Sequence, residues 1–336
     1  MTTAICILNW NGQKLLERFL PSVLAHSPKA SIYIIDNGST DQSCSWVATT
    51  YPDIHIIELD QNYGYAGGYN LGLQQIEADV YCLLNSDIRV EAGWLAPIQE
   101  SFAENSMMGL AQPRIKQIEN PEFFEYAGAA GGFLDALGYP YCRGRILNHL
   151  ERDDGQYSDS RPVQWASGAC LFVRKSCWEE LQGFDADFFA HQEEIDLCWR
   201  ARNKGWEVWT IGNSEVFHLG GATLPQSPQK WYLNFRNSLW MLQKNLPAHK
   251  IYSVLWQRMV LDGLAAVVFL CRLQFGNFFA VLKAHRDLYI YWSKNQKKRN
   301  AQDTYREDYF HSKSILWNFF VLKRSKFSDI PLDKRE

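Results

Sequence analysis

Asp87 stands where a carboxylate can hold a metal ion, just past the apolar run Val80–Leu84. Mg²⁺ and Mn²⁺ bind proteins through one or two carboxylates and complete their coordination with waters and substrate phosphate oxygens. Asn85 can support such a site by hydrogen bonding but brings no negative charge. Because Asn-Ser-Asp is also a common turn, a metal site here needs a second ligand from elsewhere in the chain.

His218 is the candidate for that second ligand. It ends a short apolar stretch and precedes Leu219 and Gly220. A single histidine in such a position is more often structural, but imidazole suits a transition-type divalent ion and would complement Asp87. The two side chains together predict a Mg²⁺ or Mn²⁺ site that holds the ion against a diphosphate.

Three carboxylates fall within four residues, at Glu193, Glu194 and Asp196. Acidic side chains complement the dipole of a helix in its first turn, and Asp196 can pair with Arg200 four residues later. Helix capping and pairing with Arg200 would account for one or two of these acids, but they account less well for all three. Crowded carboxylates raise the pKa of at least one member, which is the property that a general base for a hydroxyl group needs.

Short apolar runs alternate with helical stretches through the first half of the chain, which predicts β-α-β units and a mainly parallel sheet. The expected strands are 4–8, 31–35, 54–59 and 80–84, with helices over 13–26, from about 41, and over 65–76. The stretch 115–162 has the composition of a loop-rich insert, and no chemistry is assigned to it. Beyond it we expect a helix over 194–204 and strands over 206–211 and 215–218.

Polar clusters follow three of the expected strands, at 9–12, 36–41 and 85–87. Ligands of parallel sheets bind beyond the carboxyl ends of the strands, so these clusters should lie at one edge. Any one of them is explained as a turn or a helix cap, because Asn, Asp, Ser and Gly favour both. Three clusters at successive strand ends predict a binding site.

The glycine-rich stretch 62–70 opens the third expected helix with exposed amides, a natural place for an anion or a nucleotide. Its spacing differs from G-x-G-x-x-G, and Asp36 precedes it instead of following it by about 20 residues. Both differences weaken the interpretation of the chain as a dinucleotide-binding dehydrogenase. The sequence contains no G-x-x-x-x-G-K-[ST], so a P-loop nucleotidase is also disfavoured.

The chain has 336 residues, 46% of them hydrophobic, which suits one large domain with an appendage or two modest domains. Its net charge of −3 is unevenly distributed, because residues 241–336 carry 17 Lys and Arg against 8 Asp and Glu. A basic tail beside an acidic body suggests contact with anionic phosphate, although a solvated helical tail has the same composition.

The eight cysteines form no C-x-x-C pair, which favours a reducing compartment. The N-terminus lacks the basic and long apolar regions of a signal peptide, so we expect a cytoplasmic protein.

Residues 251–271 are largely apolar and long enough to cross a bilayer, but Arg258 and Asp262 lie near the middle. Each charge costs about 2.5–3.5 kcal/mol at the centre of an inserted helix. On a helical projection both fall in the polar half, opposite an arc that includes Trp256 and Val267. We therefore expect an amphipathic helix that lies on the inner face of the cell membrane or on the rest of the protein, with a helical packing or homodimer interface as the alternative.

Taken in order, the motifs resemble those of the inverting family-2 glycosyltransferases with the GT-A fold, in particular a rhamnosyltransferase-like branch. The matching segments are 5–12, 36–41, 62–72, 83–87, 165–175, 183–189, 193–200 and 217–218. The resemblance implies an α/β fold with a GT-A (Rossmann-like), mainly parallel sheet flanked by helices in a catalytic domain of residues 1–240. Residues 241–336 would form a basic, amphipathic helical C-terminal region.

The resemblance also implies sugar transfer from a nucleotide-diphosphate donor, with dTDP-rhamnose as the first candidate, to an acceptor hydroxyl of a surface polysaccharide or lipid-linked glycan. A divalent metal, Mg²⁺ or Mn²⁺, would be held by Asp87 and His218. Glu194 aligns with the presumed catalytic base, Glu193 is the alternative, and Asp196 would bind a sugar. Donor contacts are implied for Asn9, Asp36, Asn37, Asn62, Asn85 and Ser86.

Two positions depart from the family pattern. Asn85 replaces the first Asp of the D-x-D motif, and Glu194 replaces an Asp, which adds one methylene of reach. No nucleic-acid partner is expected. Two other functions stay open, a nucleotidyltransferase and a catalytically degenerate scaffold. A nucleotidyltransferase would have only Lys14 and Arg18 near the first strand to grip a triphosphate. For a catalytically degenerate, membrane-associated scaffold, Asn85 is the main argument.

Overall fold

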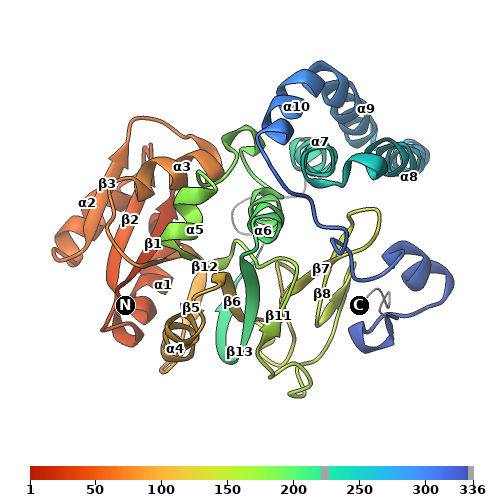
Figure 1. Cartoon of the computed structure of the whole chain (residues 1–336). Coiled ribbons are helices and arrows are strands. Elements are labelled where there is room, and N and C mark those ends of the chain that lie inside the picture. The colour runs from red at the N-terminus through yellow and green to blue at the C-terminus, as the bar shows by residue number, and fades with distance from the viewer. Residues whose placement is uncertain (221–226, 332–336) are drawn as a thin grey trace.

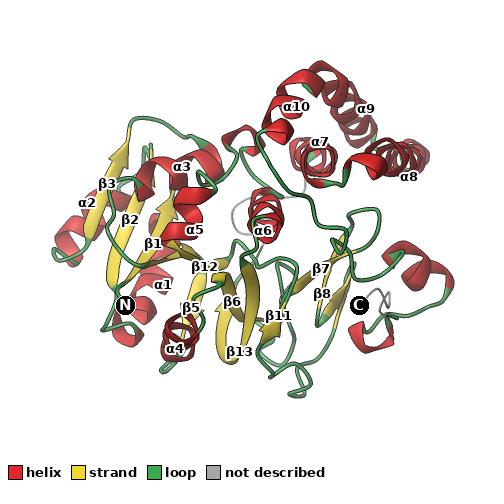
Figure 2. Cartoon of the chain, in the orientation of Figure 1, coloured by secondary structure: helices red, strands yellow, loops and turns green. Residues whose placement is uncertain are grey.

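The computed structural model describes residues 1–220 and 227–331. A nine-stranded mixed sheet runs through its centre in the order β11-β13-β6-β12-β4-β1-β2-β3, with β5 paired to β13. Helices cover both faces of this sheet, and a group of helices lies to one side of it (Figures 1 and 2). The strands of the sheet are β1 (Thr3–Asn9), β2 (Ser31–Asn37), β3 (His55–Leu59), β4 (Val80–Asn85), β5 (Ile88–Val90), β6 (Met108–Gln117), β11 (Arg161–Pro162), β12 (Cys170–Arg174) and β13 (Glu207–His218).

The first four strands form the parallel half of the sheet, as the alternating sequence pattern predicts. In β1, Ile5 and Ile7 belong to the core on one face, and Ala4 and Cys6 to the core on the other. A strand buried on both faces reads as a continuous apolar run, which is why these strands were visible in the sequence. The helices of this half are α1 (Gln13–His26), α2 (Ser43–Thr50), α3 (Gly64–Leu73) and α4 (Ala96–Glu104).

α3 lies so close to the sheet that only glycine fits at two of its buried positions, Gly68 and Gly72. A Cβ atom at Gly68 would lie 2.7 Å from Leu8 Cδ1, and one at Gly72 would lie 2.4 Å from Ile35 Cδ1. Distances this short would force the helix away from the strands. The glycine-rich run therefore serves the packing of this helix against the sheet.

The second half of the sheet is mixed, because β12 is antiparallel to both of its neighbours and β13 is parallel to β6. The expectation of two strands over 206–211 and 215–218 is wrong. They form the single strand β13, with a register shift between Ile211 and Glu215. The polar residues at this irregularity interrupted the apolar pattern, although the backbone pairing continues past them. α5 (Lys175–Glu180), η1 (Ala186–Phe188) and α6 (Glu193–Asn203) complete this half.

The insert at 115–162 contains more regular structure than its composition suggested. Four short strands form a separate antiparallel sheet: β7 (Gly132–Leu134), β8 (Pro140–Cys142), β9 (Arg145–Ile146) and β10 (His149–Leu150). Phe133 and Tyr141 of this sheet belong to the same core as Ile195 and Trp199 of α6. The insert is therefore a packed part of the fold.

The remaining helices are α7 (Pro228–Asn245), η2 (Ala248–Lys250), α8 (Ile251–Cys271), α9 (Phe275–Ile290), α10 (Trp292–Asn300), η3 (Trp317–Val321) and η4 (Phe327–Asp329). α7 begins with Pro228 and is capped by Ser227, whose Oγ accepts a hydrogen bond from Lys230 N at 3.2 Å. Figure 1 shows α7 lying between α6 and the pair formed by α8 and α9. The C-terminal helices thus reach the sheet domain through a helix that starts before residue 241.

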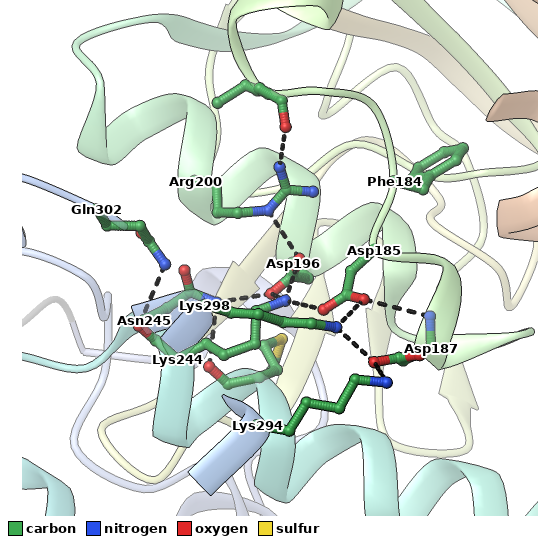
Figure 3. Close-up of polar contacts among 12 residues, drawn as sticks. Phe184, Asp185, Asp187, Asp196, Arg200, Lys244, Asn245, Lys294, Lys298 and Gln302 are labelled. Carbon is green, nitrogen blue, oxygen red and sulfur yellow. Dashed lines mark hydrogen bonds and ion pairs between the residues drawn. The ribbon is translucent and has the colours of Figure 1, made fainter. Parts of the chain in front are cut away.

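A buried network of charges joins α7 and α10 to the segment around α6 (Figure 3). Nζ of Lys244, on α7, lies 3.0 Å from Asp196 Oδ1 and 2.6 Å from Asp185 Oδ2. Lys298, on α10, also contacts Asp185 and lies 2.6 Å from Asp187 Oδ2. Burial disfavours the ionised form of Asp185, but the attraction of Lys244 and Lys298 prevails and holds its pKa well below the usual range. The C-terminal helices are therefore attached by paired charges as well as by apolar contact.

Replacing Lys244 by Met should destabilise the protein strongly, because it removes the buried cation that Asp185 and Asp196 share. The two aspartates then keep Lys298 and Arg200, respectively, which are more exposed. Breaking a buried pair from one side costs about 3–5 kcal/mol. Lys294 offers a matched control, since it also pairs with an aspartate of this network, Asp187, but its side chain is 53% exposed. Lys294→Met should cost no more than about 1 kcal/mol. Urea unfolding of both variants measures the difference, and equal losses would contradict the importance of the buried pair.

Candidate active site

Strand pairing brings Asp87 and His218 together from 131 residues apart. β5 starts directly after Asp87, and its antiparallel pairing with β13 sets Ile88 opposite His218. Nε2 of His218 lies 3.1 Å from Asp87 Oδ1. Both residues are buried, with 6% and 1% of their surface exposed. The two side chains proposed from the sequence as metal ligands are thus neighbours.

Glu125 is a third member of this cluster that the sequence did not reveal. Its Oε2 lies 3.2 Å from Nδ1 of His218, on the opposite side of the ring from Asp87. Burial disfavours a charged imidazole, but hydrogen bonds and charges from Asp87 and Glu125 prevail and raise the pKa of His218 to about 10. Glu125 lies in the insert, beside the other acids Glu119 and Glu122, and no motif distinguishes it from them.

The cluster fits a divalent cation that is shared with a substrate. Oδ2 of Asp87 is buried and has no hydrogen-bond partner within the described chain. Glu125 lies on the Nδ1 side of the His218 ring while Nε2 faces Asp87, the arrangement in which carboxylates commonly orient metal-binding imidazoles. Across residues 1–220 and 227–331, no group of three or more His, Cys, Asp or Glu side chains could itself hold a metal. Mg²⁺ and Mn²⁺ do not need such a group where phosphate oxygens and waters complete the shell.

Asn9 and Asp36 meet at the carboxyl ends of two neighbouring parallel strands. The register of β1 and β2 sets them opposite each other. Nδ2 of Asn9 donates to Asp36 Oδ1 at 2.8 Å and to Ser43 Oγ at 2.8 Å, while its Oδ1 is buried without a partner among the described residues. A Cβ atom at Gly12 would lie 2.6 Å from that oxygen. Asn9 therefore orients Asp36 and keeps one acceptor unused.

Asn37 and Asn62 hold the backbone that opens α3. Nδ2 of Asn37 donates to Gly64 O at 3.0 Å, and Oδ1 of Asn62 accepts from Gly64 N at 2.8 Å. The next amide, Tyr65 N, donates to Phe189 O at 2.8 Å. The expectation of free amides for an anion in the stretch 62–70 is wrong here, because groups of the chain itself already occupy these donors.

Glu193 and Glu194 start α6 with oxygens that have no partner. Oε2 of each is buried and makes no hydrogen bond to the described residues. Burial, reinforced by the neighbouring Glu194, raises the pKa of Glu193 well above its usual value. Burial also raises the pKa of Glu194 to about 7, although backbone amides at the helix start partly counteract it. Glu194 is the more accessible of the two, being half-buried where Glu193 is buried.

A short loop, 166–169, connects the acid pair with the Asp87 cluster. A Cβ atom at Gly168 would lie 3.7 Å from the Cβ of Glu194, and Gly168 O accepts from Tyr65 Oη at 2.6 Å. One residue further, Ala169 O accepts from Asn85 N at 3.0 Å. Asn85 and Ser86 are half-buried between these groups and Asp87. The predicted base and the segment that ends in Asp87 therefore both lie next to this loop.

Asp196 has a different environment from the two glutamates. It is fully buried, and its oxygens accept from Arg200 Nε at 2.8 Å and from Asn245 Nδ2 at 2.8 Å, beside the contact with Lys244 (Figure 3). Burial opposes its ionisation, but Lys244 and Arg200 outweigh that effect and lower its pKa. Both carboxylate oxygens of Asp196 therefore already have protein partners.

The loop before α6 has a strained backbone that α7 holds in place. Phe189, His191 and Gln192 all have positive φ angles, of 64°, 71° and 72°. Asn237 is fully buried on α7, and its Nδ2 donates to the carbonyl oxygens of Phe188, Ala190 and His191 at 3.0, 2.9 and 2.7 Å. The Asn237 side chain therefore helps to fix the loop that presents the acid pair, together with Arg236, which also donates to Phe188 O.

Removing the Asn237 amide should open this loop locally. Buried carbonyls that lose their donor cost about 1–3 kcal/mol, so hydrogen exchange over residues 185–192 should accelerate by roughly tenfold or more in Asn237→Ala. The control is Asn234→Ala, since Asn234 is on the same helix but, among the described residues, its side chain donates to the local carbonyl of Lys230 at 2.9 Å and not to the loop. Mass-spectrometric exchange checks both variants. Unchanged exchange in Asn237→Ala would show that the loop needs no such support.

Several known proteins are similar to this chain in sequence. The N-acetylglucosaminyl-diphospho-decaprenol L-rhamnosyltransferase of Mycobacterium tuberculosis is 28% identical over 232 residues, which cover 63% of this chain and 74% of that protein. The low-salt glycan biosynthesis hexosyltransferase Agl10 of Haloferax volcanii is 25% identical over 242 residues, covering 70% and 73% of the two chains.

Solved structures share the fold at lower identity. GalNAc-T7 with UDP, GalNAc and Mn²⁺ superposes with a TM-score of 0.59 at 16% identity, over 75% of this chain and 50% of that one. The mannosyltransferase PcManGT from Pyrobaculum calidifontis, with GDP-Man and Mn²⁺, gives a TM-score of 0.53 at 13% identity, over 90% of this chain and 84% of that one. The fold is GT-A, as the motif order implied. The sequence profile described as Glycosyl transferase family 2 matches residues 4–181, just over half of the chain, and the chain belongs to that family.

Proposed function

We propose that the chain is an inverting, metal-dependent glycosyltransferase that moves a sugar, with rhamnose from dTDP-rhamnose as the first candidate, onto a hydroxyl of a surface polysaccharide or lipid-linked glycan. One observation carries the proposal. The loop 166–169 lies beside Glu194, one of the two unpaired acids at the start of α6, and bonds to Asn85, two residues before the Asp87 of the buried Asp87–His218 pair. A base and a cation site that act on the same sugar carbon are what single displacement needs.

On the donor side, Asp87 and His218 would hold Mg²⁺ or Mn²⁺, and this ion would offset negative charge on the departing diphosphate. Mn²⁺ in the complexes of PcManGT and GalNAc-T7 supports this assignment. Asp36, oriented by Asn9, would accept hydrogen bonds from the nucleoside, with Asn37, Asn62, Asn85 and Ser86 around it. None of these donor-side residues, all within the described chain, is a Lys or Arg that could grip a triphosphate, which disfavours the nucleotidyltransferase alternative.

On the acceptor side, Glu194 would take the proton from the attacking hydroxyl. Its pKa of about 7 leaves a basic carboxylate available near neutral pH, and it is more accessible than Glu193. Attack from the side of α6, opposite the diphosphate, inverts the sugar carbon. We assign Asp196 to positioning α6, because its charge is already used by Lys244 and Arg200.

The acceptor is proposed to reside at the cytoplasmic face of a membrane. The relative from Mycobacterium tuberculosis acts, by its name, on an N-acetylglucosaminyl-diphospho-decaprenol, and Agl10 belongs to glycan biosynthesis. All eight cysteines are free thiols, which agrees with a reducing compartment.

A screen of nucleotide sugars with Mn²⁺ or Mg²⁺ tests the proposal. Wild type should hydrolyse or transfer from one donor only when the metal is added, and Asp87→Ala should lower that rate by about 10²–10³-fold while the fold is preserved. Asp53→Ala, an exposed aspartate on the surface, is the matched control. A degenerate scaffold would hydrolyse no donor, and full activity in Asp87→Ala would exclude the assigned metal site.

Glu194→Gln should lower kcat by about 10²–10⁴-fold with much less effect on the KM for the donor, since it removes the base and keeps the shape. Glu193→Gln is the comparison, because it removes the neighbouring carboxylate instead. A larger loss in Glu193→Gln would exchange the two roles.

The wild-type rate should depend on pH through the same group. The pKa of Glu194 is raised to about 7, so the carboxyl is protonated below that pH and the base is lost. kcat/KM should therefore fall by about tenfold per pH unit below pH 7 and reach a plateau above it. Steady-state rates across this range check the slope, and a flat profile between pH 5 and 7 would argue against a carboxylate base with this pKa.

A further inference from the structure

We propose that the outer face of α8 and α9 is a lipid-binding surface that inserts into the headgroup region of an anionic bilayer, with both helices parallel to the membrane plane. We call this face the apolar platform. Large exposed hydrophobic side chains define it: Tyr252, Trp256, Val260, Leu264 and Val267 on α8, and Phe275, Phe279, Leu282 and Tyr289 on α9. The inference deepens the proposed function by naming the surface that meets the acceptor's membrane.

α8 is oriented with its charges toward the protein and its apolar side toward solvent. Arg258 and Asp262 are buried, and Arg258 donates to Ser238 Oγ on α7 at 2.9 Å and to Leu137 O at 3.2 Å. Trp256 and Leu264, in contrast, have 68% and 59% of their surface exposed. A helix of a soluble protein packs the other way round, so the exposed face requires an apolar partner.

α9 repeats the arrangement. Its small residues Ala280 and Ala284 are buried on the side that faces α7, whereas Phe279 is 62% exposed on the outer side. The turn between the helices is short, and Tyr289 Oη reaches Met259 Sδ at 3.8 Å across them. Figure 1 shows the two helices side by side at the periphery of the molecule. The apolar platform is therefore one continuous surface made by two helices.

The buried charges favour a helix that lies on the membrane over one that crosses it. By length and composition alone, Ala248–Cys271 could span a bilayer. Spanning would remove Arg258 from Leu137 and Ser238, and each charge in hydrocarbon costs about 2.5–3.5 kcal/mol. A helix lying flat keeps these contacts and inserts only its outer face.

Charge favours lipid over a second copy of the chain as the occupant. Residues 241–336 carry 17 basic and 8 acidic side chains, and Arg272 and Arg286 are exposed on or beside the apolar platform. Two copies packed through this face would bring like charges together, whereas anionic headgroups complement them. Exposed Trp and Tyr side chains are also typical of the membrane–water boundary.

Flotation of the full chain with phosphatidylcholine vesicles, with and without phosphatidylglycerol, tests the inference. Wild type should float, more strongly with the anionic lipid and less so at high salt. The triple variant Trp256→Ser, Leu264→Ser, Phe279→Ser should lose about a hundredfold or more in partitioning. Its matched control is Trp256→Leu, Leu264→Met, Phe279→Leu, which keeps the apolar character and should still float.

Two results would overturn the inference. The first is equal flotation of the serine variant and wild type. The second is a wild-type dimer in sedimentation experiments that dissociates on serine substitution but does not dissociate when vesicles are added. Donor hydrolysis without lipid separates this inference from the proposed reaction. The serine variant should keep it, because no substituted residue contacts the acid pair or Asp87. A protein that floats but hydrolyses no nucleotide sugar would leave the apolar platform standing and overturn the transfer reaction instead.

Discussion

Helix α6 begins with three carboxylates, of which Glu193 and Asp196 are buried and Glu194 is half-buried, and the described chain supplies cations to only one of them. Asp196 is paired with Lys244 and Arg200, so it stays ionised in spite of its burial. Glu193 and Glu194 have no such partner, and their proton affinity rises because a buried charge without compensation is unfavourable. One turn of helix therefore contains a fixed anion and two groups that can exchange protons. The difference in pKa between Asp196 and the two glutamates depends on the positions of Lys244 and Arg200.

One of those cations, Lys244, comes from α7 in the C-terminal part of the chain, which makes that part a component of the candidate active site. The family profile ends at residue 181, before α6 begins. Beyond it, α7 contributes Lys244 to the charge network and Asn237 to the strained loop that leads into α6. A catalytic domain cut at residue 240 would lose Lys244 and leave Asp196 and Asp185 without their buried partner. The first 240 residues contain the proposed catalytic residues, but they do not by themselves contain Lys244, which helps to hold them in place.

The sequence was sufficient wherever a local pattern carries the information. Buried parallel strands appear as apolar runs, so Thr3–Asn9 and Val80–Asn85 and the polar residues after them were foreseen. Pairings between distant segments left no such pattern. Glu125 reaches His218 only because the insert folds back beside β6, and Lys244 reaches Asp196 only because α7 crosses α6. The glycine-rich run shows a third limit, since tight packing and anion binding select the same residue type and only the distances to Leu8 and Ile35 distinguish them.

α7 also explains how the apolar platform and the active site are kept in a fixed relation. Asn237 donates to the loop before the acid pair, and the next residue, Ser238, accepts from Arg258 of α8. Consecutive residues on a helix point about 100° apart, so one turn of α7 faces the active-site loop on one side and the charged inner edge of α8 on the other. Neither contact passes through a flexible linker. With the apolar platform on a membrane, the acid pair is held at a set height above it, and an acceptor anchored in that membrane would meet Glu194 without any movement between domains.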